Sequence, residues 1–286
     1  MRPLLVLPLL VAAALPALAQ QRPLPPVDST ALIAFDMTKG HMRKGRVVAT
    51  DDSSLTMVTL AGATVVLPRH SIKDWDRLHG TLTPAGFRPT DLATDRLFFG
   101  PTARTMPRGG RTLADHDVFI VSGAYGISDR VMLSAGTSLL EGFDSTGHSS
   151  GTGIAFADGR VGLARSRHTA VAVGAFWGVM GSERANGSVG AGYGVVTLGS
   201  NDHAVTVLGG YPFSSRSFEK QAIVMLGGET RIGRRFKLMT EFWKLPQIGR
   251  VTGIYGVRYL GDEFTLELGG GRSVVALSAA AHWRRN

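Results

Sequence analysis

The chain has 286 residues, with 37 glycines, no cysteine and a formal net charge of +9 from 31 Lys and Arg against 22 Asp and Glu. The absence of cysteine excludes a disulfide framework and a thiolate metal site, and the many glycines with little helix-type periodicity favour an all-β protein. Because the positive charges are scattered and no recognition motif accompanies them, we expect no nucleic-acid partner, and anionic lipid headgroups fit the charge better.

The first residues have the pattern of a secretory signal peptide. Arg2 precedes an apolar run over residues 4–15, and Ala17 and Ala19 supply the small residues of a cleavage site. We therefore predict a signal peptide over residues 1–19, and no cysteine follows it that could carry a lipoprotein anchor. No later apolar run is long enough for a transmembrane helix.

A small domain follows the signal peptide. Residues 20–28 contain three prolines and form a stiff lead-in. Within residues 29–79, turn signals such as Lys39-Gly40 and Asp51-Asp52-Ser53 separate short alternating segments. Five short strands in so few residues predict a small SH3-like or Sm-like β-barrel. The predicted strands are residues 31–36, 46–50, 54–60, 64–67 and 72–78.

Two roles are open for the small domain. It could bind a periplasmic peptide or protein partner by adding a strand at an open sheet edge. Alternatively, it could be a plug, cap or spacer at the mouth of a larger barrel, which we favour because no pocket-forming polar cluster is visible. His70 and Asp74 lie four residues apart near a turn, and we interpret them as exposed polar residues rather than as a catalytic or metal pair.

Residues 80–95 contain Pro84, Gly86 and Pro89 and are predicted to be a linker. Residues 96–286 then show period-2 apolar alternation in segments of roughly ten residues, which is typical of an antiparallel transmembrane β-barrel, here of about twelve strands. The predicted strands are residues 97–105, 116–127, 130–139, 153–165, 168–180, 188–199, 202–212, 220–232, 235–245, 251–260, 263–270 and 274–284.

The joins between these segments orient the barrel. Every second join has two residues, and the joins between them are longer. Bacterial barrels have short periplasmic turns and longer external loops, so we expect an outer-membrane barrel with the small domain on the periplasmic side. The two-residue joins are Ser128-Asp129, Ser166-Arg167, Ser200-Asn201, Gly233-Arg234 and Gly261-Asp262.

Alternation within the segments predicts which side chains face lipid. Three segments show it clearly, and in each we expect the apolar set outside and the glycines or polar residues inside. The predicted outward sets are Val131, Leu133, Ala135 and Leu139; Val171, Val173, Ala175, Trp177 and Val179; and Val189, Ala191, Tyr193 and Val195. Aromatic residues near segment ends are expected in the interfacial girdles: Phe98, Phe99, Tyr125, Trp177, Tyr211, Phe242, Trp243, Tyr255, Tyr259 and Trp283.

Charged residues away from the segment ends share the polar face. An outward Lys or Arg costs roughly 2 to 4 kcal/mol at the bilayer midplane, so we expect all of them to point into the lumen. A charged wall could select or bind a polar solute, but in a narrow barrel balanced charges commonly pair and fill the interior, and we favour that second interpretation. Glu241 and Lys237 are one candidate pair, although each could instead pair across strands. The eight residues are Asp158, Arg160, Glu229, Arg231, Lys237, Glu241, Arg258 and Glu267.

We predict no enzyme activity, catalytic residue, metal site or cofactor. Twelve strands is also the size of outer-membrane phospholipases, but His148-Ser149-Ser150 beside Asp144 is a Gly/Ser-rich loop and not a nucleophile and base on neighbouring strands. Gly269-Gly270-Gly271 precedes no helix and is therefore not a phosphate cradle.

Two stretches resemble a known kind of protein. Residues 94–104, TDRLFFGPTAR, and residues 125–130, YGISDR, are similar to a family of uncharacterised bacterial envelope proteins. That family joins a small N-terminal SH3/Sm-like barrel to a Gly-rich outer-membrane-type β-barrel. The resemblance implies this fold and brings no catalytic residues.

Two functional hypotheses follow. The first is an outer-membrane barrel, surrounded by membrane lipid, that acts as a narrow, porin-like pore or binds a polar solute. The second is a structural or interaction protein whose closed barrel anchors a periplasmic partner-binding module. The second hypothesis needs no open lumen.

Overall fold

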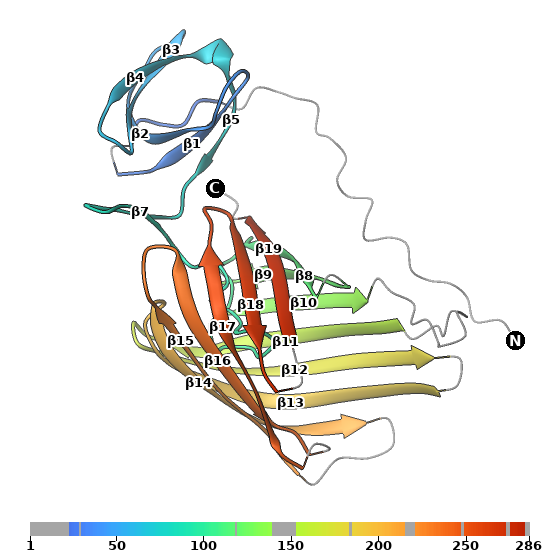
Figure 1. Ribbon diagram of the computed structural model, residues 1–286. Coiled ribbons are helices and arrows are strands. Elements are labelled where there is room, and N and C mark those ends of the chain that lie inside the picture. Colours follow the sequence, from blue (N-terminus) through green and yellow to red (C-terminus); the bar gives the residue numbers. More distant parts are fainter. Residues whose placement is uncertain are drawn as a thin grey trace, which may run out of the picture. The chain divides into compact units, whose positions relative to one another are not determined.

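The computed structural model in Figure 1 describes residues 23–28, 30–117, 119–138, 153–182, 185–214, 221–246, 249–272 and 275–283. The predicted signal peptide, residues 1–19, lies outside these residues, as does the loop with Asp144 and His148. The chain forms two compact units, Met1–Leu78 and His79–Asn286. In the part of the chain that is described, no helix is long and apolar enough to cross a membrane.

The first unit contains a five-stranded antiparallel sheet with the strand order β4-β3-β2-β1-β5. All five predicted strands are present, with ends shifted by at most three residues. Alternate side chains point to one side and form the core, where Phe35, Val47, Leu55 and Met57 are completely buried. The SH3-like or Sm-like assignment stays a prediction. The elements are β1 Ile33–Met37, β2 Arg43–Thr50, β3 Ser54–Thr59, β4 Thr64–Pro68, the 3-10 turn η1 Arg69–Ser71 and β5 Ile72–Arg77.

The turn between β2 and β3 is held by the residues of its turn signal, Asp51-Asp52-Ser53. Asp51 Oδ1 accepts hydrogen bonds from the backbone amides of Ser53 and Ser54, each at 2.7 Å. The hydroxyls of Ser54 and Ser53 also donate to this carboxylate, and these hydroxyls and amides together lower the pKa of Asp51 to about 2. An ionised aspartate therefore holds the turn together from within.

The second unit contains twelve antiparallel strands that close into a barrel, which confirms the predicted strand number. Each strand pairs with its neighbours in sequence, and β19 pairs back to β8. Closure leaves no strand edge unpaired. The strands are β8 Arg111–His116, β9 Ile120–Ser128, β10 Val131–Ser138, β11 Gly153–Arg165, β12 Thr169–Ser182, β13 Ala185–Gly199, β14 His203–Ser214, β15 Ile223–Arg231, β16 Phe236–Lys244, β17 Val251–Leu260, β18 Phe264–Gly270 and β19 Val275–Trp283.

Residues 80–95 are not the plain linker that their prolines and glycines predict. Strands β6, Gly80–Thr83, and β7, Gly86–Pro89, form a two-stranded hairpin. The glycine that starts β7, Gly86, has φ of 107°, a conformation that favours glycine. Beyond this hairpin the chain runs into the barrel.

The predicted first barrel strand, residues 97–105, is wrong. Residues 90–106, which we call the inner loop, lie inside the barrel, and the first strand of the wall is β8. The apolar run Leu97-Phe98-Phe99 resembles a strand segment, but Pro101 has no amide for a ladder, and Leu97 and Phe98 are buried within the lumen. The predicted strand 116–127 corresponds to the end of β8, the turn after it and β9.

Outward sets are predicted for three strands, and in two of them, β10 and β12, the observed inward and outward faces agree with the prediction. In β10 Leu133 is exposed while Met132 is buried, and in β12 Val173, Ala175 and Trp177 are exposed. In β13 the prediction is inverted. There Gly192, Gly194, Val196 and Leu198 face outward, and Tyr193 and Val195 face the lumen. The inversion has a physical cause, because Leu97 and Ala103 of the inner loop give Tyr193 and Val195 an apolar surface to pack on inside the barrel.

Exposed apolar side chains cover the outer face of the barrel. They include several aromatics of the predicted girdles, such as Tyr125, Trp177, Tyr211, Tyr255 and Trp283. The girdle prediction is wrong for Phe98, which is buried in the lumen, and for Phe99 and Trp243, which line a cavity inside the barrel.

Two glycines of the barrel wall make room for the inner loop. A Cβ on Gly227 of β15 would collide with Leu97, and one on Gly269 of β18 would lie 2.8 Å from the ring of Phe98. By contrast, a Cβ on the outward Gly209 of β14 would meet nothing within 4 Å. The lumen is therefore shaped for the side chains of this loop.

We predict that Gly227→Leu destabilises the barrel, because the new side chain and Leu97 need the same space. The expected cost is about 1 to 3 kcal/mol, typical of overpacking, whereas Gly209→Leu should change stability by less than about 1 kcal/mol. Urea unfolding of the refolded protein in lipid vesicles measures both. Equal effects at the two positions would contradict the placement of the inner loop.

Candidate functional site

The lumen of the barrel is the part of the molecule where charged side chains converge, and the inner loop runs through it. The loop turns back on itself, with Leu97 N donating to Gly100 O at 2.8 Å and Thr102 N donating to Asp95 O at 2.9 Å. Its tip is therefore the segment Phe98-Phe99-Gly100, and its two legs run side by side.

Both legs of the inner loop lie near the short turns of the barrel. Before the loop, Pro89 O accepts from Arg231 Nη1 at 3.0 Å, next to the turn between β15 and β16. On the returning leg, Arg104 Nη2 donates to Ser200 O at 2.6 Å, and Thr105 Oγ1 donates to Asp129 O at 2.7 Å. The loop thus enters and leaves at the short-turn end, and its tip points toward the opposite end. That end carries the longer loops, although β8 and β9, and β12 and β13, are joined there by short connections that the predicted alternation of joins did not include.

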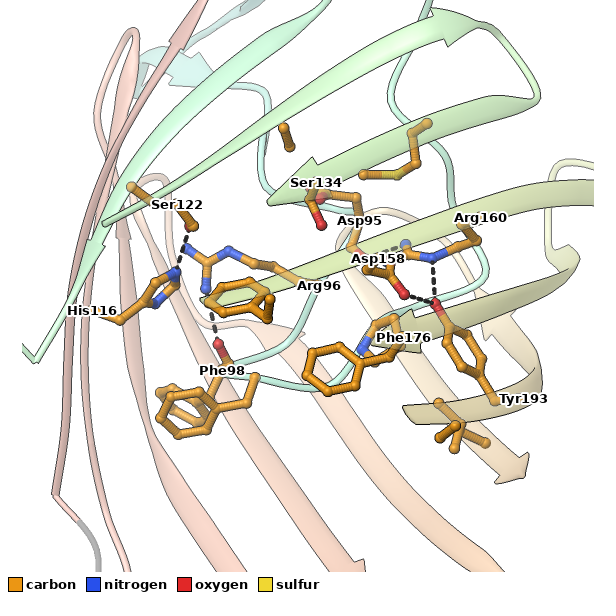
Figure 2. A pocket seen from close by; sticks show the side chains of 18 of the residues that line it. Asp95, Arg96, Phe98, His116, Ser122, Ser134, Asp158, Arg160, Phe176 and Tyr193 are labelled. Carbon is orange, nitrogen blue, oxygen red and sulfur yellow. Dashed lines mark hydrogen bonds and ion pairs between the residues drawn. The ribbon is translucent and has the colours of Figure 1, made fainter. Parts of the chain in front are cut away.

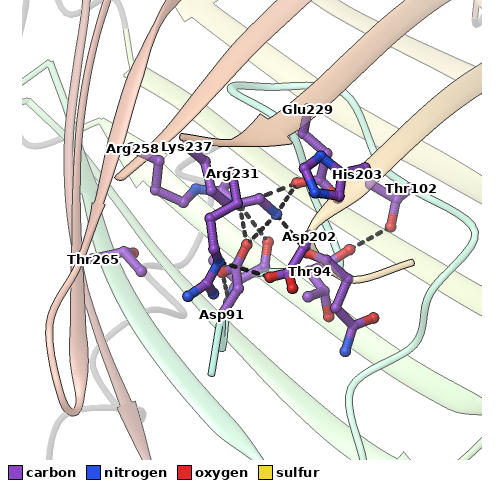
Figure 3. A network of polar contacts seen from close by, with 12 residues as sticks. Asp91, Thr94, Thr102, Asp202, His203, Glu229, Arg231, Lys237, Arg258 and Thr265 are labelled. Carbon is purple, nitrogen blue, oxygen red and sulfur yellow. Dashed lines mark hydrogen bonds and ion pairs between the residues drawn. The ribbon is translucent and has the colours of Figure 1, made fainter. Parts of the chain in front are cut away.

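A cluster of buried ion pairs ties the first leg to the wall (Figure 3). Lys237 Nζ lies 2.7 Å from Asp91 Oδ2 and 2.5 Å from Glu229 Oε2. Arg258 lies 3.2 Å from Asp91 Oδ2 and 2.7 Å from Glu267 Oε1. The side chains of these five residues are at most 2% exposed. Because the cluster is cut off from water, each charge depends on its partner.

The inner loop adds two arginines to the same cluster. Arg96 Nη1 lies 2.7 Å from Glu267 Oε2, and Arg104 Nη1 lies 2.8 Å from Glu229 Oε1. Glu229 is therefore shared by Lys237 and Arg104, and Glu267 by Arg258 and Arg96. Each of these two wall glutamates thus binds cations of both the wall and the loop, and Glu229 also lies 3.9 Å from Arg258 Nη1.

Opposing effects act on the carboxyl group of Asp91. Burial by itself raises its pKa, but the ammonium of Lys237 and the guanidinium of Arg258 outweigh this and hold the pKa below its ordinary value of 3.8. The backbone amide of Ala93 also donates to Asp91 at 2.9 Å. Asp91 is therefore a fixed negative charge between two cations.

Backbone groups of the inner loop complete the network. Arg258 donates to Ala93 O at 2.9 Å and to Arg96 O and Leu97 O at 3.0 Å. Arg160 of β11 donates to Asp95 O at 2.7 Å and to Thr102 O at 3.0 Å. These carbonyls lie outside the barrel sheet, and the guanidinium groups supply donors that satisfy them.

Glu241 has a different role from the one its spacing predicts. It does not pair with Lys237; its carboxylate accepts from the backbone amides of Phe99 and Gly100, both at 3.0 Å, and from Trp243 Nε1 at 2.5 Å. It thereby holds the tip of the inner loop. A Cβ on Gly100 would lie 2.9 Å from Met225 Cε and 3.1 Å from the ring of Trp243, so the tip approaches the wall closely at this glycine.

The other predicted lumen residues form two smaller groups. Asp158 lies 3.3 Å from Arg160 Nη2 and accepts a hydrogen bond of 2.6 Å from Tyr193. Arg231 Nε lies 2.6 Å from Asp202 at the short-turn end. The structure therefore brings Glu229, Lys237, Arg258 and Glu267 together and leaves Asp158 with Arg160, Arg231 and Glu241 apart from that cluster.

Sequence reasoning missed Asp91 in the predicted linker, Arg104 in the supposed first strand, and Arg96 between the two. One signal was available. Arg96 and Arg104 flank an apolar run with Gly100-Pro101 in its middle, and a strand of a transmembrane barrel does not carry that proline readily. The identity of the partners was not available, because Asp91 and Lys237 are 146 residues apart in sequence.

A cavity of about 430 Å³ lies beyond the tip of the inner loop, and we call it the vestibule (Figure 2). Its floor includes Phe98 and Phe99, and its walls come from strands β8 to β16. Ile120 and Ile223 begin β9 and β15 at the end of the longer loops, whereas Thr112 and Met132 lie near the short-turn ends of β8 and β10. The vestibule therefore extends along the side of the inner loop as well as beyond its tip. Among the described residues, no group of three His, Asp or Glu side chains is placed to hold a metal ion.

Comparisons with known proteins add little to this geometry. No protein-family model matches the chain, and no curated protein matches it in sequence. Among solved structures, the KdgM porin is similar over 62% of this chain and 98% of its own, with 9% identity and a TM-score of 0.42. OmpT, an outer membrane protein of Vibrio cholerae in its trimer form, is similar over 89% of this chain and 97% of its own, with 13% identity and a TM-score of 0.30. At these values neither protein assigns a function to this chain.

We predict that Lys237→Met strongly destabilises the barrel, because Asp91 and Glu229 would lose the cation between them. Breaking a buried ion pair on one side typically costs about 3 to 5 kcal/mol. The matched control is Lys244→Met at the exposed end of the same strand, which should cost less than about 0.5 kcal/mol. Urea unfolding in lipid vesicles measures both, and similar losses at the two lysines would contradict a structural role for the cluster.

Proposed function

We propose that this chain is an outer-membrane β-barrel that its own inner loop closes, and that it anchors the small domain rather than conducting solutes. The observation that carries the proposal is the inner loop itself, bound on both legs and at its tip by wall residues. A general pore needs a continuous water-filled path. The buried side chains of Leu97, Phe98 and Arg258 occupy that path in the lumen.

The outer face supports the membrane part of the proposal. Exposed residues on strands β15, β16 and β18 are apolar, for example Leu226 at 50%, Leu238 at 42% and Leu266 at 46% exposure. A protein surrounded by water rarely exposes so much apolar surface, whereas a closed barrel in lipid requires it. Lipid, including anionic headgroups near the strand ends, is accordingly the partner that we propose for this surface.

The saturation of the lumen charges argues against the polar-solute hypothesis. Each charged side chain of the central cluster already binds an opposite charge, and Glu241 binds three donors. A solute would have to displace these partners, which costs several kcal/mol per buried charge. The proposal therefore contains no solute site among these charges, no catalytic step and no cofactor.

The small domain offers a second candidate function, the binding of a partner. Strand β4 pairs only with β3 and lies at the edge of the sheet, and Val66 in it is 59% exposed. An exposed edge with an apolar side chain favours the addition of a strand from a peptide or protein. With the short turns on the periplasmic side, where the chain enters the barrel, we place this domain in the periplasm.

We predict that Leu226→Arg impairs the barrel, because a guanidinium at mid-strand on the outer face would lie in hydrocarbon. The expected cost is about 2 to 4 kcal/mol in lipid vesicles. The control is Leu82→Arg in β6, outside the barrel wall, which should change stability by less than about 0.5 kcal/mol. Heat-modifiable gel mobility and urea unfolding report both, and a harmless Leu226→Arg would contradict a lipid-facing surface.

Conductance in planar bilayers tests closure directly. We expect no steady channels from the wild-type protein or from Gly209→Leu. A variant in which Gly and Ser replace residues 92–104 at unchanged length should conduct, because it lacks the side chains that fill the lumen. Heat-modifiable mobility verifies that each barrel is folded. Steady wild-type channels would favour the narrow pore instead.

A further inference from the structure

The vestibule has no role in anchoring, and its chemistry differs from that of the lumen below it. We propose that it binds an uncharged, largely apolar small molecule that carries a hydrogen-bonding group. This proposal goes beyond the anchoring function and does not require the barrel to be closed at its short-turn end.

The volume and the aromatic lining of the vestibule indicate the size and the apolar character of its ligand. Its volume of about 430 Å³ falls in the range of small-molecule pockets. Six aromatic side chains line it: Phe98, Phe99, Phe156, Phe176, Tyr193 and Trp243. Phe156 and Phe176 stand beside each other with ring centroids 6.0 Å apart and an interplanar angle of 28°. Such flat apolar walls stabilise an apolar or aromatic ligand by contact and by release of water.

The charged residues that line the vestibule indicate the charge of its ligand. Its wall contains two acids, Asp95 and Asp158, and two bases, Arg96 and Arg160. Arg96 is bound by Glu267 at 2.7 Å, and Arg160 by Asp158 at 3.3 Å and by three carbonyl oxygens. Since neither cation is left without an acceptor, a carboxylate or phosphate on the ligand would have no partner and would have to lose its hydration. The wall therefore disfavours an anionic ligand.

Two hydroxyl groups in the vestibule indicate that its ligand carries a hydrogen-bonding group. Ser134 of β10 lines the vestibule, and among the described residues it has no hydrogen-bond partner. Ser122 of β9 lies there as well, 3.1 Å from His116 Nε2 (Figure 2). Neutral donors and acceptors on one wall, opposite aromatic side chains, suit a ligand with one polar end such as an aromatic alcohol.

The test uses the full-length protein in lipid nanodiscs, because detergent tails would compete for an apolar cavity. The probes are 2-naphthol, which is uncharged at neutral pH, and 2-naphthoate, which has the same rings and an anionic group. Equilibrium dialysis against empty nanodiscs separates binding from partition into lipid. We expect saturable binding of one 2-naphthol per chain and about tenfold or more weaker binding of 2-naphthoate.

Two matched variants locate the binding. Ala191→Phe on β13 places a ring in the vestibule and should weaken 2-naphthol binding by about tenfold or more, whereas Ala175→Phe on the outer face of β12 should bind as the wild type does. Should Ala191→Phe fail to fold by heat-modifiable mobility, Ser134→Phe fills the same cavity from β10. Unsaturable uptake equal to that of empty nanodiscs, equal affinity for 2-naphthoate, or unchanged binding by the folded filling variant would each overturn the proposal.

Discussion

Charges buried in the lumen of the barrel are the constraint on which the rest of the structure depends. Transferring an ion from water to a dry interior costs several kcal/mol, so each must meet an opposite charge and enough hydrogen bonds. Lys237 and Arg258 of the wall meet that requirement through Asp91, a residue of the inner loop. The wall charges and the charged residues of the loop therefore depend on each other, because neither set could be buried away from water without the other.

The inner loop also explains features of the wall that a hollow barrel would not need. Glycine at 227 and 269 leaves the space that Leu97 and Phe98 fill, and Tyr193 and Val195 turn inward onto an apolar surface of the same loop. Glu241 uses its carboxylate to hold two backbone amides at the tip instead of a solute. Each of these residues fits a filled lumen, and together they make the barrel a packed protein core enclosed in its own sheet.

The two ends of the barrel differ because the loop reaches only part of the way. At the short-turn end its returning leg binds Ser200 and Asp129, and the lumen there is filled. Beside and beyond the tip the loop leaves part of the lumen unfilled, and the vestibule is that space. Its floor belongs to the inner loop, so the proposed closure and the proposed binding would share Phe98 and Phe99 while depending on different contacts.

The sequence by itself determined the all-β class, the five strands of the small domain, the barrel strands β9 to β19 and the faces of β10 and β12, because strand alternation is local and has a period of two residues. It also marked eight charged residues as a group, since lipid excludes them from the outer face. Only the tertiary structure decided that residues 97–105 fill the lumen, that β13 turns Tyr193 inward, and that Lys237 binds Asp91 and Glu229 rather than Glu241. The physical reason is that these choices depend on partners far away in the chain, and a filled lumen accepts apolar and charged side chains alike, so polarity alone no longer tells inside from outside.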